Sequence, residues 1–276
     1  MPAYDGLIID LDGVVWRGRV PIDGAAEAIG VLRQHGIRLV FMTNEPGSTR
    51  LAFAARLTAI GIPATSADVL TSAAATARTI AALDPLPDRR TFVIGPHALV
   101  EEIRAAGLEV VTGEPARTVP VVVVGAHQGF DYQELRTATL ALRNGARLFA
   151  TGRDAIFPSA DGPWPGTGAV LAAVETAGGV QAEVVGKPEA VMFELAQEVL
   201  AGCERLAIVG DNLSSDIAGA KRAGLHAILV LTGASTRADL DEAKVDPDLV
   251  VASIADLPQA LGIGEPPTGS VDQAPA

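Results

Sequence analysis

Polar residues able to bind or transfer phosphate stand where apolar runs of this sequence end. Asp10 and Asp12 follow the run LII, Asp211 follows LAIVG, and Thr43 follows RLVFM. Lys187 precedes the helical pattern EAVMFELAQEVL. In an open parallel sheet, ligands bind beyond the carboxyl ends of the strands. We therefore expect these polar residues to meet in one site if the apolar runs are parallel strands.

The charges of these residues predict a divalent cation. Asp10, Asp12, Asp211 and Asp216 together with Lys187 carry a net charge of −3 when all are ionised. Such a site repels a phosphate dianion unless a cation bridges the charges. Ligands that are all oxygen atoms, with room for water, indicate Mg²⁺. An ionised aspartate is also a competent nucleophile for phosphoryl transfer through an aspartyl-phosphate.

Hydrogen-bond donors and a positive charge for phosphate are present as well. The Thr43 hydroxyl and the backbone N–H groups that follow it can hold phosphate oxygens, and Lys187 supplies a compact positive charge. Gly13 permits a tight turn directly after the two N-terminal aspartates.

Each motif also has an ordinary structural explanation when it is taken alone. An Asp-x-Asp-Gly turn is common loop chemistry. Thr43 and Asn44 can cap a helix, and Lys187 can be a solvated lysine at a helix start. Asp211 and Asn212 can form a plain turn, with a serine capping the next helix. The coincidence of all four motifs at strand-to-helix junctions of one chain favours the functional interpretation.

Helical segments that end at a glycine and are followed by short apolar runs recur along the chain. The glycines at these junctions, where a left-handed helix cap belongs, are Gly36, Gly61, Gly107, Gly145, Gly202 and Gly224. The runs after them are nearly all apolar, which is typical of strands buried on both faces of a parallel sheet. We therefore predict an α/β fold with a doubly wound parallel sheet. The predicted strands are 6–10, 37–42, 91–95, 120–125, 146–151, 205–210, 225–231 and 248–252.

The middle of the chain differs in composition from its flanks. Residues 70–182 contain nine arginines, no lysine and eleven acidic residues, a net charge of −2 out of −12 for the whole chain. This contrast is consistent with an inserted domain. We predict a core of 1–69 plus 183–263, an inserted α/β domain of 70–182 and a disordered tail of 264–276. The Pro- and Gly-rich segments 84–90 and 152–166 are predicted to be loops.

The overall composition excludes several classes of protein. Of the 276 residues, 49% are hydrophobic and 20% are charged, as in globular proteins. A net charge of −12 argues against a nucleic acid polymer or an anionic membrane as partner. Because Cys203 is the single cysteine, no intramolecular disulfide is expected, and a cytoplasmic location follows as the prediction. No apolar stretch approaches the roughly 18 residues of a membrane helix.

Four motifs, in this order, resemble those of the haloacid dehalogenase superfamily. They are DLDGVVW, FMTNEPGST, VVGKPEAVMF and IVGDNLSSDIAGAKRAG. Thr43 and Lys187 are 144 residues apart, which is similar to subclass IIA, the NagD-like or 4-nitrophenylphosphatase-type phosphatases that insert a large α/β cap there. The similarity runs from about Tyr4 to PDLVVASIADL, nearly the whole folded chain. It implies a Rossmann-like core and a cap at 70–182. Caps of this type often dimerise, so a homodimer formed through the cap is one option, and the oligomeric state stays open.

The resemblance implies a catalytic role for the charged motif residues. By position, Asp10 is the nucleophile and a Mg²⁺ ligand, and Asp12 is the general acid and base that binds the metal through its carbonyl. Asp211 is a further Mg²⁺ ligand. Lys187 neutralises the phosphate, and Asp216 orients Lys187.

Other motif positions are implied to contact phosphate or substrate. They are Gly13, Thr43, Asn44, Glu45 and Asn212. Glu45 departs from the family pattern, in which Asn usually follows Thr-Asn. This departure puts the choice of substrate in question rather than the type of reaction.

A segment of the cap is expected to determine specificity, because the core motifs contact only phosphate and metal. In the family, a cap segment often reads Thr-Asn-x-Asp. Here residues 151–154 read Thr-Gly-Arg-Asp, so Gly152 replaces the asparagine and Asp154 ends the segment. Phe157 falls where relatives place a residue that reaches the leaving group. We therefore expect Asp154 and Phe157 to contact the substrate. The alternative is that Phe157 and Trp164 pack the cap's own core.

Two classes of function follow from the sequence. The first is a Mg²⁺-dependent phosphatase for a small soluble phosphomonoester, such as a nucleotide, sugar phosphate, glycerol phosphate or phosphoglycolate. The second is a non-catalytic phospho-ligand binding or regulatory protein in which Glu45 has abolished turnover. The intact Asp10, Asp12, Lys187 and Asp211 favour the enzyme. A dinucleotide-dependent oxidoreductase is set aside, because DLDGVV rather than G-x-G-x-x-G follows the first strand.

Overall fold

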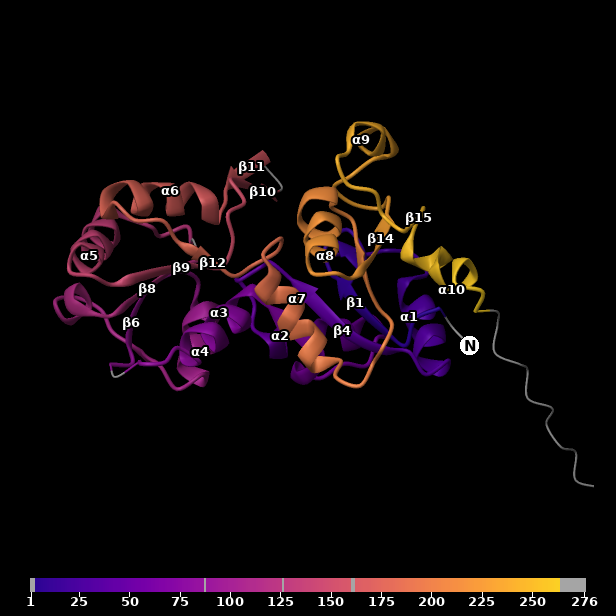
Figure 1. The fold of residues 1–276 in the computed structure, drawn as a ribbon, viewed down its shortest axis with the longest axis horizontal. Coiled ribbons are helices and arrows are strands. Elements are labelled where there is room, and N and C mark those ends of the chain that lie inside the picture. The colour runs from indigo at the N-terminus through magenta and orange to yellow at the C-terminus, as the bar shows by residue number, and fades with distance from the viewer. Residues whose placement is uncertain (1–2, 87, 126, 160–161, 264–276) are drawn as a thin grey trace, which may run out of the picture. The chain divides into compact units, whose positions relative to one another are not determined.

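A computed structural model describes residues 3–86, 88–125, 127–159 and 162–263 (Figure 1). The predicted disordered tail, 264–276, lies outside the described residues. The chain divides into two units, which are described separately below. Unit 1 comprises Met1–Phe41, Thr58–Ile62 and Leu200–Ala276, and unit 2 comprises Met42–Leu57 and Pro63–Val199. The bounds predicted for the core and the cap stay a prediction.

The larger sheet carries the first acidic motif. Its strands lie in the order β15 (Leu249–Val251), β14 (His226–Val230), β13 (Leu206–Gly210), β1 (Gly6–Asp10), β4 (Arg38–Thr43) and β5 (Val69–Thr71). β1 and β13 are parallel, with Ile9 opposite Val209. Every residue of β1 is buried, as expected for a strand covered on both faces. Asp10 therefore ends an interior strand of this sheet.

The smaller sheet belongs to unit 2. Its strands lie in the order β12 (Glu183–Val184), β9 (Arg147–Ala150), β8 (Val121–Val124), β6 (Arg90–Ile94) and β7 (Glu109–Val110). All neighbouring pairs in it are parallel. Val122 packs in one apolar core with Leu142 of α5 and Leu171 of α6. Figure 1 shows α4 on the opposite side of this sheet.

Helices connect these strands. Those of unit 1 are α1 (Ala25–Gln34), η3 (Leu213–Ile217, a π-helix), α8 (Ala218–Arg222), α9 (Arg237–Glu242), η4 (Ile254–Asp256) and α10 (Leu257–Ala260). Those that lie wholly or mostly in unit 2 are α2 (Arg50–Ala59), η1 (Ser66–Asp68), α3 (Ser72–Ala81), α4 (His97–Ala105), η2 (Pro115–Thr118), α5 (Tyr132–Arg143), α6 (Thr167–Gly178) and α7 (Ala190–Val199). None of the helices in the described ranges is long and apolar enough to cross a membrane.

The predicted α/β fold is confirmed. All eight predicted strands are present, and each begins and ends within one residue of the predicted bounds. The six glycines predicted as helix caps all have positive φ, from 73° at Gly224 to 97° at Gly145. The prediction that 84–90 forms a loop agrees with β6 beginning only at Arg90.

The prediction that the whole of 152–166 is a loop is wrong. β10 (Ile156–Ser159) and β11 (Gly162–Pro165) form an antiparallel hairpin with Phe157 opposite Trp164. Proline cannot donate to a sheet ladder, so its presence argues against an interior strand. A two-stranded hairpin has only edge strands, however, and it tolerates proline where the missing N–H would face outward.

Candidate active site

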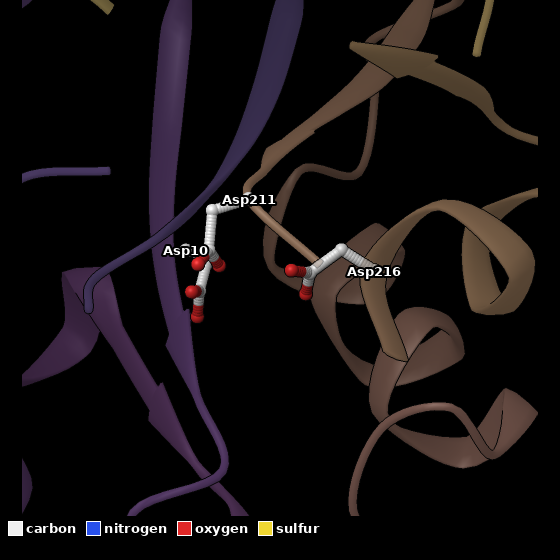
Figure 2. Close-up of side chains that lie close together, drawn as sticks. All are labelled: Asp10, Asp211 and Asp216. Atoms are coloured by element: carbon white, nitrogen blue, oxygen red, sulfur yellow. The ribbon is translucent and has the colours of Figure 1, made fainter. Parts of the chain in front are cut away.

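Three buried carboxylates meet at the carboxyl ends of β1 and β13. One oxygen from each of Asp10, Asp211 and Asp216 lies within 4.8 Å of the others, and the three residues are only 7%, 7% and 1% exposed. Figure 2 shows these side chains close together. Carboxylates this close repel one another unless a cation or a proton lies between them. The cluster is therefore a site for positive charge.

The sheet register explains how Asp10 and Asp211 come together. β1 and β13 are neighbouring parallel strands, and the pairing of Ile9 with Val209 brings their carboxyl ends to the same level. Asp10 is the last residue of β1, and Asp211 directly follows β13. Asp10 and Asp211 thus lie close together, as expected for residues at the ends of neighbouring parallel strands.

Asp216 reaches the cluster because the chain turns tightly after β13. The Asn212 carboxamide accepts hydrogen bonds from the N–H groups of Ser214 (2.9 Å) and Ser215 (3.1 Å), so Asn212 caps η3. The Asn212 N–H donates to the Asp216 carboxylate (3.1 Å). A Cβ at Gly210 would overlap Asp216, so glycine is needed there. Asn212, predicted to contact substrate, uses its side-chain oxygen for the cap.

The Asp211 side chain lies between two glycines. Gly13 has φ of 79°, and a Cβ on it would overlap the Asp211 carboxylate. A Cβ on Gly233 would overlap the same carboxylate, which also accepts a hydrogen bond from the Ala234 N–H. The sequence reasoning missed Gly233 and Ala234. Their position in the loop that follows β14, at the same edge of the sheet, is the signal that could have found them.

Asp12 is not part of the carboxylate cluster. Its side chain is exposed, and Oδ1 accepts a hydrogen bond of 3.1 Å from the Gly18 N–H. Gly18 lies in the turn of a small hairpin formed by β2 (Trp16–Arg17) and β3 (Val20–Pro21). The Asp12 carboxylate is therefore accessible to solvent and is not buried with those of Asp10 and Asp211.

In unit 2, the Asn44 side chain holds the backbone of Lys187. Its Nδ2 donates to the Lys187 carbonyl, and its Oδ1 accepts from the Lys187 N–H, both at 2.8 Å. The Ser72 hydroxyl in turn donates to the Asn44 carbonyl at 2.7 Å. Gly186 approaches the Thr151 carbonyl so closely that a Cβ would overlap it. This pairing of residues 143 positions apart was not predicted.

Lys187 is not a solvated surface lysine, because it is only 4% exposed. Thr43, the last residue of β4, is also buried, and its Oγ1 accepts a hydrogen bond of 3.1 Å from the Glu45 N–H. Unit 2 thus contains a buried ammonium group, a buried hydroxyl and the turn that follows β4. These are the groups expected to hold phosphate.

The Glu45 carboxylate lies along its own loop. Oε1 accepts a hydrogen bond of 3.4 Å from the Ser48 hydroxyl, and a Cβ at Gly47 would come within 2.9 Å of the same atom. Glu45 is exposed. Its charge is therefore partly satisfied within the segment that follows Thr43.

Phe157 and Trp164 pack against each other in the β10–β11 hairpin. Their ring centroids are 6.1 Å apart in an edge-to-face arrangement at 63°. Phe157 remains 44% exposed, and Asp154 is also exposed. Both residues that were expected to contact substrate are therefore accessible. Phe157 and Trp164 pack against each other, but neither is among the described residues that form the apolar core of this unit, which contains Val122, Leu142 and Leu171.

The loop before this hairpin is fixed by an ion pair. Arg153 donates to both carboxylate oxygens of Glu175 on α6, at 3.0 and 2.8 Å, and the Ala182 N–H donates to the same carboxylate at 2.9 Å. Hydrogen bonding from Arg153 lowers the pKa of Glu175, and Glu175 raises the pKa of Arg153. Gly168 contacts the Arg153 carbonyl so closely that a side chain would not fit.

Comparisons with known proteins give a consistent result. A family model described as haloacid dehalogenase-like hydrolase matches residues 7–109, and a second HAD-hydrolase-like model matches residues 184–257. The acid sugar phosphatase of Staphylococcus epidermidis is 36% identical over 264 residues, 93% of this chain and 99% of the relative.

Two solved structures are similar over nearly the whole chain. The p-nitrophenyl phosphatase of Archaeoglobus fulgidus is 34% identical with a TM-score of 0.86, covering 94% of this chain and 100% of the other. The glycerol phosphate phosphatase of Mycobacterium tuberculosis, in complex with magnesium, is 34% identical with a TM-score of 0.85, covering 93% of this chain and 78% of the other.

Proposed function

The chain belongs to the haloacid dehalogenase-like hydrolases and is a phosphatase of that family, and on this premise we propose a role for each site residue. The substrate is a small phosphomonoester. The observation that carries the proposal is the cluster of Asp10, Asp211 and Asp216 at the carboxyl ends of two paired strands. Asp10 is the proposed nucleophile.

The donor set of this cluster fits a hard divalent cation. Asp10, Asp211 and Asp216 offer only oxygen atoms and are buried at the ends of two strands and in the turn after β13. Oxygen-only sites of this kind favour Mg²⁺. Asp10 and Asp211, with the carbonyl of Asp12, are the proposed ligands. A bound Mg²⁺ would neutralise part of the charge of the phosphate.

The proposed reaction has two steps at phosphorus. An Asp10 carboxylate oxygen attacks the phosphorus, and the ester bond breaks with its electron pair going to the leaving oxygen. That oxygen takes a proton from Asp12. Asp12 then takes a proton from a water molecule, whose oxygen attacks the phosphorus of the aspartyl-phosphate, and the bond between phosphorus and the Asp10 oxygen breaks with its electron pair going to Asp10. Inorganic phosphate leaves, and the Asp10 carboxylate is restored.

The residues of unit 2 are proposed to hold the phosphate. Thr43 and the backbone N–H groups after it would donate hydrogen bonds to phosphate oxygens, and Lys187 would stabilise the charge of the transferring group. Asn44 would contribute its backbone, because its side chain already binds Lys187. Asp216 is proposed to orient Lys187. Asp154 and Phe157 are proposed to contact the leaving group.

The relatives differ in the substrates they are named for, so the physiological ester is a matter for assay. We propose the class of small sugar, glycerol or nucleotide phosphates, in line with the acid sugar and glycerol phosphate phosphatases to which the chain is similar. A panel of phosphate esters, ranked by kcat/KM, identifies the substrate. The cap-mediated homodimer and the cytoplasmic location stay predictions.

Hydrolysis of p-nitrophenyl phosphate with and without Mg²⁺ tests the proposal. We expect activity with Mg²⁺, loss with EDTA, and loss in Asp10→Asn with the fold retained. Asp131→Asn is the matched control, because Asp131 only caps α5 and Asn is an equally good cap. Near wild-type turnover by Asp10→Asn would contradict the covalent mechanism. Phosphate binding without turnover in the wild type would favour a non-catalytic protein.

A further inference from the structure

The loop that follows β14, Thr232–Ser235, joins the two acidic segments of unit 1. We call these four residues the β14 loop. None of the four motifs contains this segment. Three of its residues nevertheless make hydrogen bonds to the segments that carry Asp10 and Asp211. The fourth, Gly233, lies directly against the Asp211 carboxylate.

One half of the β14 loop holds Asp211 by two hydrogen bonds and the neighbouring Leu213 by a third. The Ala234 N–H donates to Oδ2 of Asp211, and the Ser235 N–H donates to the Asp211 carbonyl at 3.0 Å. The buried Ser235 hydroxyl accepts from the Leu213 N–H at 3.0 Å. Because the backbone and the side chain of Asp211 are both held, rotation of its carboxylate is restricted.

The other half of the β14 loop is attached to the segment after Asp10. The Thr232 hydroxyl donates to the Gly13 carbonyl, and the Arg17 Nε donates to the Thr232 carbonyl. Gly13 is the residue whose missing side chain makes room for the Asp211 carboxylate. The Thr232 hydroxyl therefore links the turn that follows Asp10 to the loop that orients Asp211.

We propose that the β14 loop is a positioning element for the metal site: the N–H groups of Ala234 and Ser235 hold Asp211 in place to bind a divalent cation, and the hydroxyl groups of Thr232 and Ser235 hold the loop itself against Gly13 and Leu213. This inference rests on the proposed function, in which Asp211 is a metal ligand. Groups that orient a ligand typically change metal affinity about 10- to 100-fold when they are removed. Neither hydroxyl belongs to the residues proposed to contact the substrate.

Direct Mn²⁺ binding, followed by the EPR signal of free Mn²⁺ without substrate, tests the inference. Thr232→Val removes the hydroxyl at nearly constant volume, and we expect it to weaken Mn²⁺ binding at least about tenfold. Thr232→Ser keeps the hydroxyl and should bind within about threefold of the wild type. Ser235→Ala should resemble Thr232→Val. The Mg²⁺ concentration for half-maximal hydrolysis should shift in parallel.

Thr236→Val is the matched control. The Thr236 hydroxyl, one residue beyond the loop, bonds to Asp239 at the start of α9 (2.7 Å), away from Asp211 and Gly13, so Mn²⁺ binding should be unchanged. Wild-type Mn²⁺ affinity in both Thr232→Val and Ser235→Ala would overturn the inference. Loss of the folded circular dichroism spectrum in both would also overturn it, because the loop would then be a stability element. A wild type that neither binds Mn²⁺ nor hydrolyses phosphate esters would instead overturn the proposed function.

Discussion

Replacing Asn44 by alanine tests whether this side chain acts through Lys187. The Asn44 carboxamide makes two hydrogen bonds of 2.8 Å to the backbone of Lys187. Each bond contributes about 1 kcal/mol, so about 2 kcal/mol holds the Lys187 backbone in place. If all of this energy serves to position the Lys187 ammonium group in the transition state, loss of the two hydrogen bonds in Asn44→Ala lowers kcat/KM about 30-fold. Lys187→Ala should cost more, roughly 10²- to 10³-fold in kcat.

A double-mutant cycle separates positioning from direct contact. With p-nitrophenyl phosphate and saturating Mg²⁺, we expect Asn44→Ala to lower kcat/KM in the wild type but to have little further effect in Lys187→Ala. Asn144→Ala is the control, because Asn144 bonds the Arg117 carbonyl at 3.0 Å elsewhere in unit 2 and should leave kcat/KM unchanged. Equal losses in both backgrounds would refute the reasoning. The Asn44 side chain would then act on phosphate independently of Lys187.

Three further predictions concern the acid, the hairpin and the ion pair. Asp12→Asn should slow alkyl phosphates more than p-nitrophenyl phosphate, because a poor leaving group needs the proton most; equal losses in kcat would count against this role. Phe157→Ala should reorder the natural substrates while p-nitrophenyl phosphate turnover stays within roughly tenfold; a parallel loss on every substrate would make Phe157 structural. Glu175→Gln should lower the Tm at neutral pH, because the lowered pKa of Glu175 means that its ionised form stabilises the fold. That stabilisation is lost as pH falls through the folded-state pKa, so the Tm values of variant and wild type should converge in acid; a constant difference would contradict it.

The main strands could be predicted because each is a short apolar run bounded by turn residues. β1 and β8 are buried at every position, so their composition alone indicates a strand covered on both faces. β7 and β12 have only two residues each, too few for any pattern to appear. The β10–β11 hairpin was missed for a different reason: its proline and glycine content is that of a loop, and only its pairing makes it a sheet.

The convergence of Asp10 and Asp211 could be predicted, but not the side-chain contacts of residues such as Asn44. Asp10 and Asp211 were expected together because strand ends share one edge of a parallel sheet, and the register of β1 with β13 agrees. Which atoms Asn44 bonds depends on where Lys187 lies, 143 residues away. Asn44 was therefore assigned to phosphate, although its side chain holds the Lys187 backbone.

The acidic cluster depends on a contact between distant parts of the chain. β1 pairs with β13 although Asp10 and Asp211 are some 200 positions apart, so the carboxylates are brought together only when this pairing forms. Apolar residues of both strands are fully buried there, including Ile8, Ile9 and Ile208. Burial of each such side chain contributes about 1.5 to 3 kcal/mol. That apolar burial is a source of free energy to offset the repulsion among the three carboxylates, so the site can form before a cation is bound.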